Sequence, residues 1–317
     1  MNILVFGTGA VGLGLASSLI RTGHQVDLIG RAGTVTALRQ SGLKQSGIFG
    51  EHRIAPSEFF AADSLQDLPP KTYDFILVCT KSFDTQPAAQ TLASAPFLIH
   101  DEPTRFVLCQ NGWGNAEIFA DFFPKERVKS ARIITGFCRP QKHQVEITVH
   151  ADAIHLGNLF GKEVDDLTDL SSAIDSGGIP CRVTSTISRD LWAKMLYNCM
   201  LNGLSTVFGV PYGLLGESPD TRELMQSIAQ EVFSVMQADG HDTHWPRVED
   251  YLEAFYKQQL PATYKHEPSM LQDIRAQKRT EIDALNGAVA RLGNRHDVPV
   301  PHNTFVTHMI RFMESRI

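Results

Sequence analysis

Residues 2–12 read Asn-Ile-Leu-Val-Phe-Gly-Thr-Gly-Ala-Val-Gly. An apolar run that leads at once into Gly-x-Gly-x-x-Gly predicts a buried strand turning into a helix. Gly7 permits the tight turn, Gly9 leaves room beside the backbone, and Gly12 lets the helix approach the strand. The start of that helix offers unpaired N–H groups and a partial positive charge to phosphates. The stretch predicts a dinucleotide-binding α/β domain, and the alternative is a glycine-rich turn that binds nothing.

Strand and helix patterns alternate along the residues that follow. Apolar residues come in runs rather than at every second position, which is typical of parallel strands buried on both faces. Two later segments differ, because Val145–Val149 and Ala153–Leu156 partly alternate and predict an antiparallel pair. The predicted parallel strands are Ile3–Phe6, Gln25–Ile29, Phe75–Cys79, Arg105–Gln110 and Val128–Thr135, with a first helix at about residues 10–22.

The pattern changes near residue 184. From Ser185 onward the apolar residues recur at helical spacing, and prolines divide the helical segments from one another. The predicted fold class is therefore α/β, with two domains. Residues 1–184 are predicted to form an N-terminal Rossmann-type dinucleotide-binding domain. Residues 185–317 are predicted to form a C-terminal all-helical domain, whose expected role in substrate binding and catalysis rests on the motifs described below.

Composition excludes several classes of protein. The 317 residues include 29 Lys and Arg against 35 Asp and Glu, so the net charge of −6 gives no basis for nucleic-acid binding. No apolar stretch approaches the length of a membrane span, and no signal segment is expected at the start. Five scattered cysteines without a C-x-x-C pair favour the reducing cytoplasm. His241 and His244 lack a clear third ligand, so no metal site is expected.

The end of the second strand predicts which dinucleotide is bound. Strands of this kind that bind NAD usually end in an acidic residue, which contacts the ribose hydroxyl. Here the strand ends in Gly30 and Arg31, and a guanidinium suits a 2′-phosphate, which favours NADPH. Lys81 and Asn111 follow two later strands and are expected to face the cofactor. As alternatives, Arg31 is a solvated loop residue and the other two are ordinary polar loop residues.

A polar stripe lies on the helix predicted at residues 192–202. Lys194, Asn198 and Asn202 are four residues apart and share one face. The rest of this helix is nearly all apolar, which predicts that it is buried. Because buried polar groups need partners, a bound substrate is the favoured interpretation of the stripe. The alternative is a solvated helix face.

A second helix is predicted over residues 268–287, with Ser269 at its start and Glu281 inside it. Ser269 followed by Gln272 forms a capping-box pattern, and a helix start also attracts a carboxylate. For Glu281 the alternative to a functional role is an ion pair with Lys278 within the helix. An apolar stripe packs this helix onto the core, and consists of Leu271, Ile274, Ile282, Leu285, Val289 and Leu292.

Together these motifs resemble the ketopantoate reductase family (2-dehydropantoate 2-reductase), over essentially the whole chain. The resemblance rests on the glycine turn at residues 7–12, on Thr80-Lys81, on Gln110-Asn111-Gly112, and on the helix with Trp192, Lys194, Asn198 and Asn202. It rests also on the segment from Ser269 through Glu281 to Gly287. Members of this family reduce a 2-oxo acid with NADPH in the pantothenate pathway.

The resemblance implies a role for each site residue. It makes Lys194 the proton donor of catalysis. The substrate-binding residues that it implies are Asn111, Asn198, Asn202 and Ser269. The cofactor-binding residues are Gly7, Thr8, Gly9, Ala10, Val11, Gly12, Arg31, Lys81, Asn111 and Glu281. Hydride transfer to a ketone leaves negative charge on oxygen, which a nearby ammonium can stabilise and protonate, so the chemistry agrees with these roles.

The resemblance therefore implies an NADPH-dependent oxidoreductase that reduces ketopantoate to pantoate, and the scattered cysteines favour a cytoplasmic location. Its expected ligands are NADPH or NADP⁺ and a small 2-oxo acid, with no metal, nucleic acid or membrane, and a homodimer is left open. One alternative is a reductase of another bulky 2-oxo acid that uses the same residues. The other is a non-catalytic NADPH-sensing protein, which would have no need to keep Lys194 in the site.

Overall fold

The computed structural model describes residues 1–95 and 104–317. The chain divides into two compact units. The first unit comprises Met1–Gln110 and Asn115–Ile187, and the second comprises Asn111–Gly114 and Ser188–Ile317. The predicted linear division at residue 184 did not anticipate that four residues from the middle of the first domain would pack with the second. None of the helices in the described parts of the chain is long and apolar enough to span a membrane.

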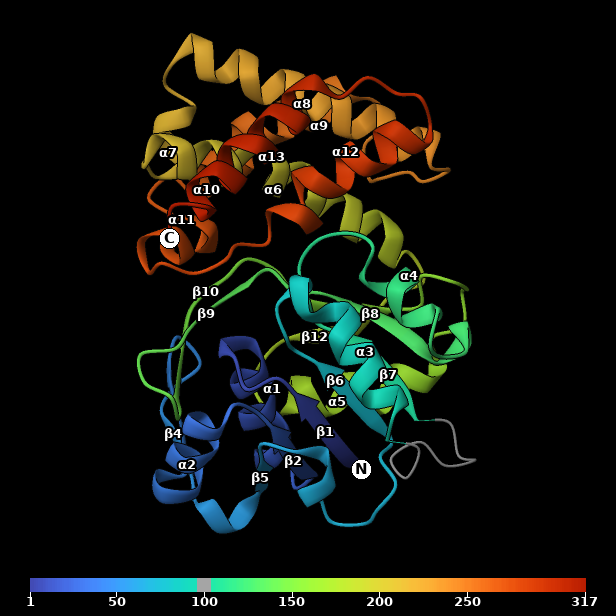
Figure 1. Ribbon diagram of the computed structural model, residues 1–317, viewed down its shortest axis with the longest axis vertical. Coiled ribbons are helices and arrows are strands. Elements are labelled where there is room, and N and C mark those ends of the chain that lie inside the picture. Colours follow the sequence, from blue (N-terminus) through green and yellow to red (C-terminus); the bar gives the residue numbers. More distant parts are fainter. Residues whose placement is uncertain (96–103) are drawn as a thin grey trace. The chain divides into compact units, whose positions relative to one another are not determined.

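An eight-stranded sheet forms the centre of the first unit (Figure 1), in the order β12-β11-β8-β7-β6-β1-β2-β5. All neighbouring pairs are parallel except β11 with β8. The strands are β1 (Asn2–Phe6), β2 (Gln25–Ile29), β5 (Phe60–Ala62), β6 (Phe75–Val78), β7 (Arg105–Leu108), β8 (Val128–Arg132), β11 (Ile154–Gly157) and β12 (Cys181–Val183). The helices are α1 (Ala10–Arg21), α2 (Ala32–Ser41), α3 (Thr85–Ala93), α4 (Asn115–Ala120) and α5 (Thr168–Ser176).

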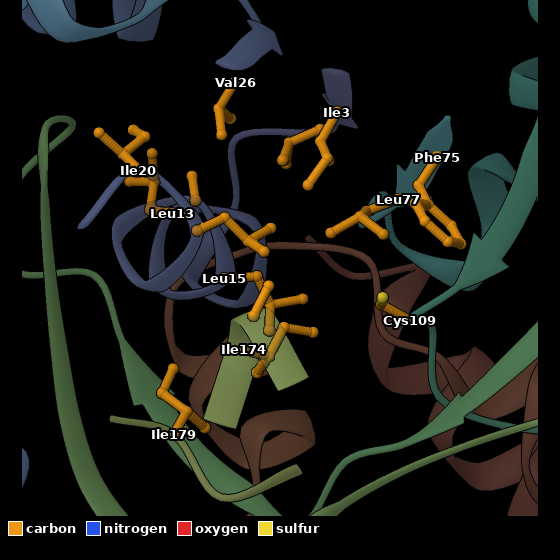
Figure 2. Packing of buried hydrophobic residues seen from close by; sticks show 14 of the residues in the cluster. Ile3, Leu13, Leu15, Ile20, Val26, Phe75, Leu77, Cys109, Ile174 and Ile179 are labelled. Atoms are coloured by element: carbon orange, nitrogen blue, oxygen red, sulfur yellow. The ribbon is translucent and has the colours of Figure 1, made fainter. Parts of the chain in front are cut away.

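Alternate side chains of β1 enter two different cores, because successive residues of a strand point to opposite faces of the sheet. Ile3 and Val5 lie in the core that contains side chains of α1 and α5. Figure 2 shows this core, where Leu13 and Leu15 of α1 lie among residues of the sheet and of α5. Leu4 and Phe6 lie in the second core, which contains side chains of α3 and α4. Helices on both faces of a mainly parallel sheet confirm the predicted Rossmann-type fold.

A second sheet of four strands completes this unit, in the order β4-β3-β10-β9. Its strands are β3 (Leu43–Gly47), β4 (His52–Ile54), β9 (Thr135–Cys138) and β10 (Gln144–His150). The predicted antiparallel pair of residues 145–149 and 153–156 is wrong, because β10 pairs with β9 and β3 while β11 joins the large sheet. The predicted strand 128–135 is divided, and its last residue begins β9. The chain leaves the large sheet between Arg132 and Thr135, which supplies β10 with a partner that the sequence pattern did not show.

The described residues of the second unit form helices and connecting turns, with no strand. Its longest helix is α6 (Ile187–Phe208), which contains Lys194, Asn198 and Asn202 as predicted. The remaining helices are α7 (Tyr212–Leu215), α8 (Pro219–Ala238), α9 (Val248–Ala254), α10 (Leu260–Ala262), α11 (Ser269–Arg275), α12 (Asn286–Arg295) and α13 (Pro301–Glu314), with a π-helical turn at Phe255–Gln259 and a 3-10 turn, η8, at Ile282–Ala284.

The continuous helix predicted over residues 268–287 is interrupted. Helix α11 ends at Arg275, and Gln277 adopts the left-handed conformation with φ of 53°. The N–H of Lys278 bonds back to the carbonyl of Asp273, which closes the helix end. Glu281 therefore lies in a turn just before η8, so the prediction that it lies inside a helix is wrong. The alternative of an ion pair with Lys278 within one helix fails for the same reason. The Thr280 hydroxyl accepts a hydrogen bond from the N–H of Ile282 and starts this new turn.

The predicted capping box at the start of α11 is also absent. Pro268 occupies the position before the helix and offers no side-chain oxygen, so Ser269 becomes the first helical residue. The side chain of Gln272 donates instead to the carbonyl of Glu267, at 3.2 Å. The fixed φ of Pro268 shapes the entry to the helix in place of a side-chain cap.

Candidate active site

The glycine turn between β1 and α1 has the geometry of a phosphate cradle. Gly7 has φ of +113°, and a Cβ atom there would lie 2.7 Å from the backbone of Cys79. A Cβ atom on Gly12 would lie 2.1 Å from the carbonyl oxygen of Gly7, so glycine is required at both positions. At Gly9 the nearest atom would be 3.7 Å away, and no side chain caps the start of α1. These features fit a dinucleotide pyrophosphate bound at the helix N-terminus.

The end of β2 lies against this turn. A Cβ atom on Gly30 would lie 1.9 Å from the hydroxyl oxygen of Thr8, which brings the start of α2 close to the glycine turn. Arg31 is exposed at the position before α2, and the first turn of α2 contains no acidic residue. A guanidinium at the start of a helix without nearby carboxylates suits a phosphate group.

Two further cations, at the glycine turn and at the start of α2, were not predicted from the sequence. Arg139 donates to the carbonyl of Thr8 at 3.1 Å. The ammonium nitrogen of Lys142 lies 2.7 Å from the place that a Cβ atom on Gly33 would occupy, in the first turn of α2. Both come from the turn between β9 and β10, over 100 residues after Arg31. No local pattern marks them, because tertiary folding alone brings this turn to the start of α1 and α2.

Hydrogen bonds tie the ends of β6 and β7 together. The side-chain amide of Gln110, after β7, donates to the hydroxyls of Thr80 at 3.1 Å and Thr85 at 2.8 Å. Lys81 follows Thr80 and is half-buried just before a short 3-10 turn. Both strand ends lie at the carboxyl edge of the parallel sheet, which is where ligands bind in folds of this type.

In the second unit, Asn111 joins Lys194 to Glu281. The amide oxygen of Asn111 accepts from the Lys194 ammonium at 2.6 Å, and its nitrogen donates to a Glu281 carboxylate oxygen at 3.1 Å. Glu281 is 7% exposed, and Lys194 is half-buried on α6. Lys194 lies 83 residues after Asn111 in the sequence, and Glu281 lies 170 residues after it. Three distant segments thus form one polar network. An ammonium held in this way by a neutral amide can act on a polar ligand as a hydrogen-bond and proton donor.

Asn198 and Asn202 continue this polar stripe along α6, and both are buried. The amide oxygen of Asn202 accepts from the hydroxyl of Tyr212 at 2.5 Å. Burial raises the pKa of Tyr212 well above its ordinary value, so this hydroxyl stays neutral and able to donate. Tyr212 was not predicted from the sequence, because tertiary packing brings its hydroxyl to Asn202 and no local pattern marks this contact. Within the described residues, the side chain of Asn198 makes no hydrogen bond.

Ser269 stands apart from this network in its contacts. It is exposed in the first turn of α11 and makes no side-chain hydrogen bond with the described residues. Its hydroxyl and the start of the helix are both able to donate hydrogen bonds to a carboxylate.

Comparisons with known proteins match one family along most of the chain. Residues 3–161 match the family described as Ketopantoate reductase PanE/ApbA, and residues 186–314 match Ketopantoate reductase PanE/ApbA C terminal. The 2-dehydropantoate 2-reductase of Aquifex aeolicus (strain VF5) is 33% identical to this chain, over 99% of this chain and 97% of its own length.

Solved structures show the same fold. The PanE/ApbA family ketopantoate reductase from Ralstonia eutropha JMP134 has a TM-score of 0.86 and 27% identity, and the likeness covers 100% of this chain and 99% of that one. D-mandelate dehydrogenase, solved with NADH and anilino(oxo)acetate, has a TM-score of 0.87 and 24% identity over 100% and 99% of the two chains. At that identity the second likeness concerns the fold alone.

Proposed function

Since the chain belongs to the ketopantoate reductase family, we propose that it reduces 2-dehydropantoate to pantoate with NADPH, in the supply of pantothenate. The observation that carries this proposal is the network of Lys194, Asn111 and Glu281. It positions an ammonium group, which can give a proton to a ketone oxygen, through a neutral amide that also bonds to a carboxylate.

The first unit is proposed to hold the cofactor. Gly7, Gly9 and Gly12 leave the backbone open to the pyrophosphate, together with Thr8, Ala10 and Val11 in the same turn. Arg31 is assigned to the 2′-phosphate because of its charge and its place at the end of β2. Lys81, Asn111 and Glu281 complete the proposed set of cofactor-binding residues.

Bound NADPH supplies the hydride that reduces the C2 ketone. Lys194 stabilises the negative charge that develops on the ketone oxygen and gives it a proton. Asn111 holds the ammonium in place through its amide oxygen. Asn198, Asn202 and Ser269 orient the carboxylate and hydroxyl groups of the substrate through their amide and hydroxyl groups.

Residues 1–184 and 185–317 are proposed as the cofactor domain and the substrate domain, with residues 111–114 contributed to the latter. The free thiols of all five cysteines are in keeping with a cytoplasmic location, which we also propose. The proposed ligands are a small 2-oxo acid and NADPH.

The test is the oxidation of NADPH and of NADH by the pure protein with a panel of 2-oxo acids. We expect the largest kcat/KM for ketopantoate with NADPH. A clear preference for another bulky 2-oxo acid would keep the chemistry and change the substrate. NADPH binding without turnover of any 2-oxo acid would contradict the proposal and favour a sensing protein.

A further inference from the structure

Within the second unit, the tetrapeptide Asn111–Gly114 is held in place by its third residue, Trp113. The indole ring of Trp113 packs on that of Trp192 in α6, with 4.5 Å between ring centroids and 35° between planes. It also meets the ring of His241 edge-on, at 4.9 Å. Trp113 is 5% exposed and Trp192 is fully buried. Aromatic pairs of this kind stabilise a fold beyond the area that they bury, so the contact with Trp192 holds Trp113 in the second unit.

The backbone of the same segment is fastened to the turn that carries Glu281. The N–H of Trp113 donates to the carbonyl of Ala284 at 2.9 Å. Gly112 has φ of +89°, and a Cβ atom there would lie 2.3 Å from the same carbonyl oxygen. The N–H of Ala284 in turn bonds to the carbonyl of Glu281 at 3.0 Å. These two bonds, from Trp113 to Ala284 and from Ala284 to Glu281, therefore fix the backbone of the Asn111 segment relative to Glu281.

We propose that Trp113 is a positioning residue, which holds the Asn111 amide between Lys194 and Glu281. Among the described residues, Trp113 itself makes no hydrogen bond to Lys194 or Glu281. Its ring packs on Trp192, two residues before Lys194, while its backbone bonds to Ala284, three residues after Glu281. Trp113 thereby links the two segments that carry the partners of Asn111. This inference rests on the proposed role of Lys194 as proton donor.

The test compares Trp113→Ala and Trp113→Phe in the native chain and in an Asn111→Ala background. Misplacing a catalytic group by about 1 Å costs on the order of 100-fold in rate, so Trp113→Ala should lower kcat about 10- to 100-fold. Trp113→Phe should recover much of the loss, because a phenyl ring still packs on Trp192. In the Asn111→Ala background, Trp113→Ala should change kcat less than about threefold, since residues acting through one another are non-additive. Trp245→Phe, an aromatic change at the ring that meets Tyr251, is the matched control.

A second readout does not depend on turnover. Hydrogen exchange of the Asn111 side-chain amide, followed by ¹⁵N NMR, reports its bond to Glu281. Exchange should become faster in Trp113→Ala and stay slow in Trp113→Phe and Trp245→Phe. Equal losses of kcat in both backgrounds, or unchanged exchange in a folded Trp113→Ala protein, would overturn the inference. If the native protein reduces no 2-oxo acid, the proposed function fails and the exchange measurement still decides the role of Trp113.

Discussion

At the scale of single residues, the site depends on the side chain of Asn111, which accepts one hydrogen bond and donates another. A carboxamide accepts through its oxygen and donates through its nitrogen, so Asn111 can serve an ammonium and a carboxylate together. Aspartate at this position would place a second carboxylate beside Glu281, and leucine would leave both partners without their bond. Asparagine is thus the residue type that suits a place between Lys194 and Glu281.

Lys194→Ala tests the proposed proton donor. Loss of a general acid typically reduces the rate about 10²- to 10⁴-fold, so kcat should fall by that amount. NADPH binding should stay near native, because most of the proposed cofactor-binding residues, including the glycine turn and Arg31, belong to the other unit. Stopped-flow turnover and fluorescence titration with NADPH measure the two effects. Lys257→Ala, which removes an exposed lysine paired with Glu253, is the control. Turnover within about threefold of native would show that the proton comes from another group.

Tyr212→Phe tests how Asn202 is held. With the hydroxyl removed, the Asn202 amide oxygen loses a partner in a buried place, at a cost of about 1–3 kcal/mol. If Asn202 binds substrate as proposed, KM for the 2-oxo acid should rise about tenfold, while kcat changes less because Lys194 is untouched. Tyr197→Phe removes a comparable hydrogen bond, to Thr263 at 2.6 Å, and should leave KM unchanged. Equal values of KM for all three proteins would remove Tyr212 from the account of substrate binding.

At the scale of elements, local patterns predicted most strands and helices of the fold but not their ends or partners. The first strand, glycine turn and helix follow from adjacent residues, and the stripe on α6 follows from spacing alone. The end of α11 could not be predicted in this way, because Gln277 adopts a left-handed conformation that is usually found at glycine. The separation of β10 from β11 was missed for a related reason, since strand pairing is decided by residues distant in sequence.

The end of α11 gives a paired prediction on stability. A residue with a side chain in the left-handed region costs roughly 1–2 kcal/mol relative to glycine. Gln277→Gly should therefore leave the free energy of unfolding unchanged or raise it by about 0.5 kcal/mol, because greater freedom of the unfolded chain offsets part of the gain. Gln277→Val should lower it by more than about 1 kcal/mol, since branching at Cβ worsens the strain. Urea denaturation measures both, and a Val variant as stable as the Gly variant would contradict the conformation described.

At the scale of the whole molecule, each unit supplies a different part of the proposed chemistry. The Rossmann-type fold could be predicted because one motif and its strand–helix context fix the architecture. Arg139 and Lys142 could not, because the turn between β9 and β10 reaches the start of α1 and α2 through folding alone. Trp113 escaped notice for a similar reason, since its segment follows a strand of one unit and packs in the other.

Cofactor preference is the property of the first unit that is most open to measurement. Arg31→Ala should weaken NADPH binding by about 1–3 kcal/mol, the value of a hydrogen bond to a charged group, and leave NADH binding unchanged. Lys142→Ala should act in the same direction but less strongly, because its exposed ammonium is more fully solvated. Calorimetric titration of both dinucleotides measures this, with the exposed Lys162→Ala as control. Native protein that binds NADH as tightly as NADPH would contradict the role given to Arg31.

The contribution of residues 111–114 to the second unit limits how this chain can be recombined with its relatives. A chimaera joined at residues 187 and 188 would inherit Lys194, Trp192 and Glu281 from one parent, and Asn111 and Trp113 from the other. In such a hybrid, the tetrapeptide of one parent would have to pack and bond with the helical part of the other parent, with which it did not evolve. Exchanging residues 111–114 together with the helical part should restore these contacts. The unit that can be exchanged between relatives is therefore discontinuous in sequence.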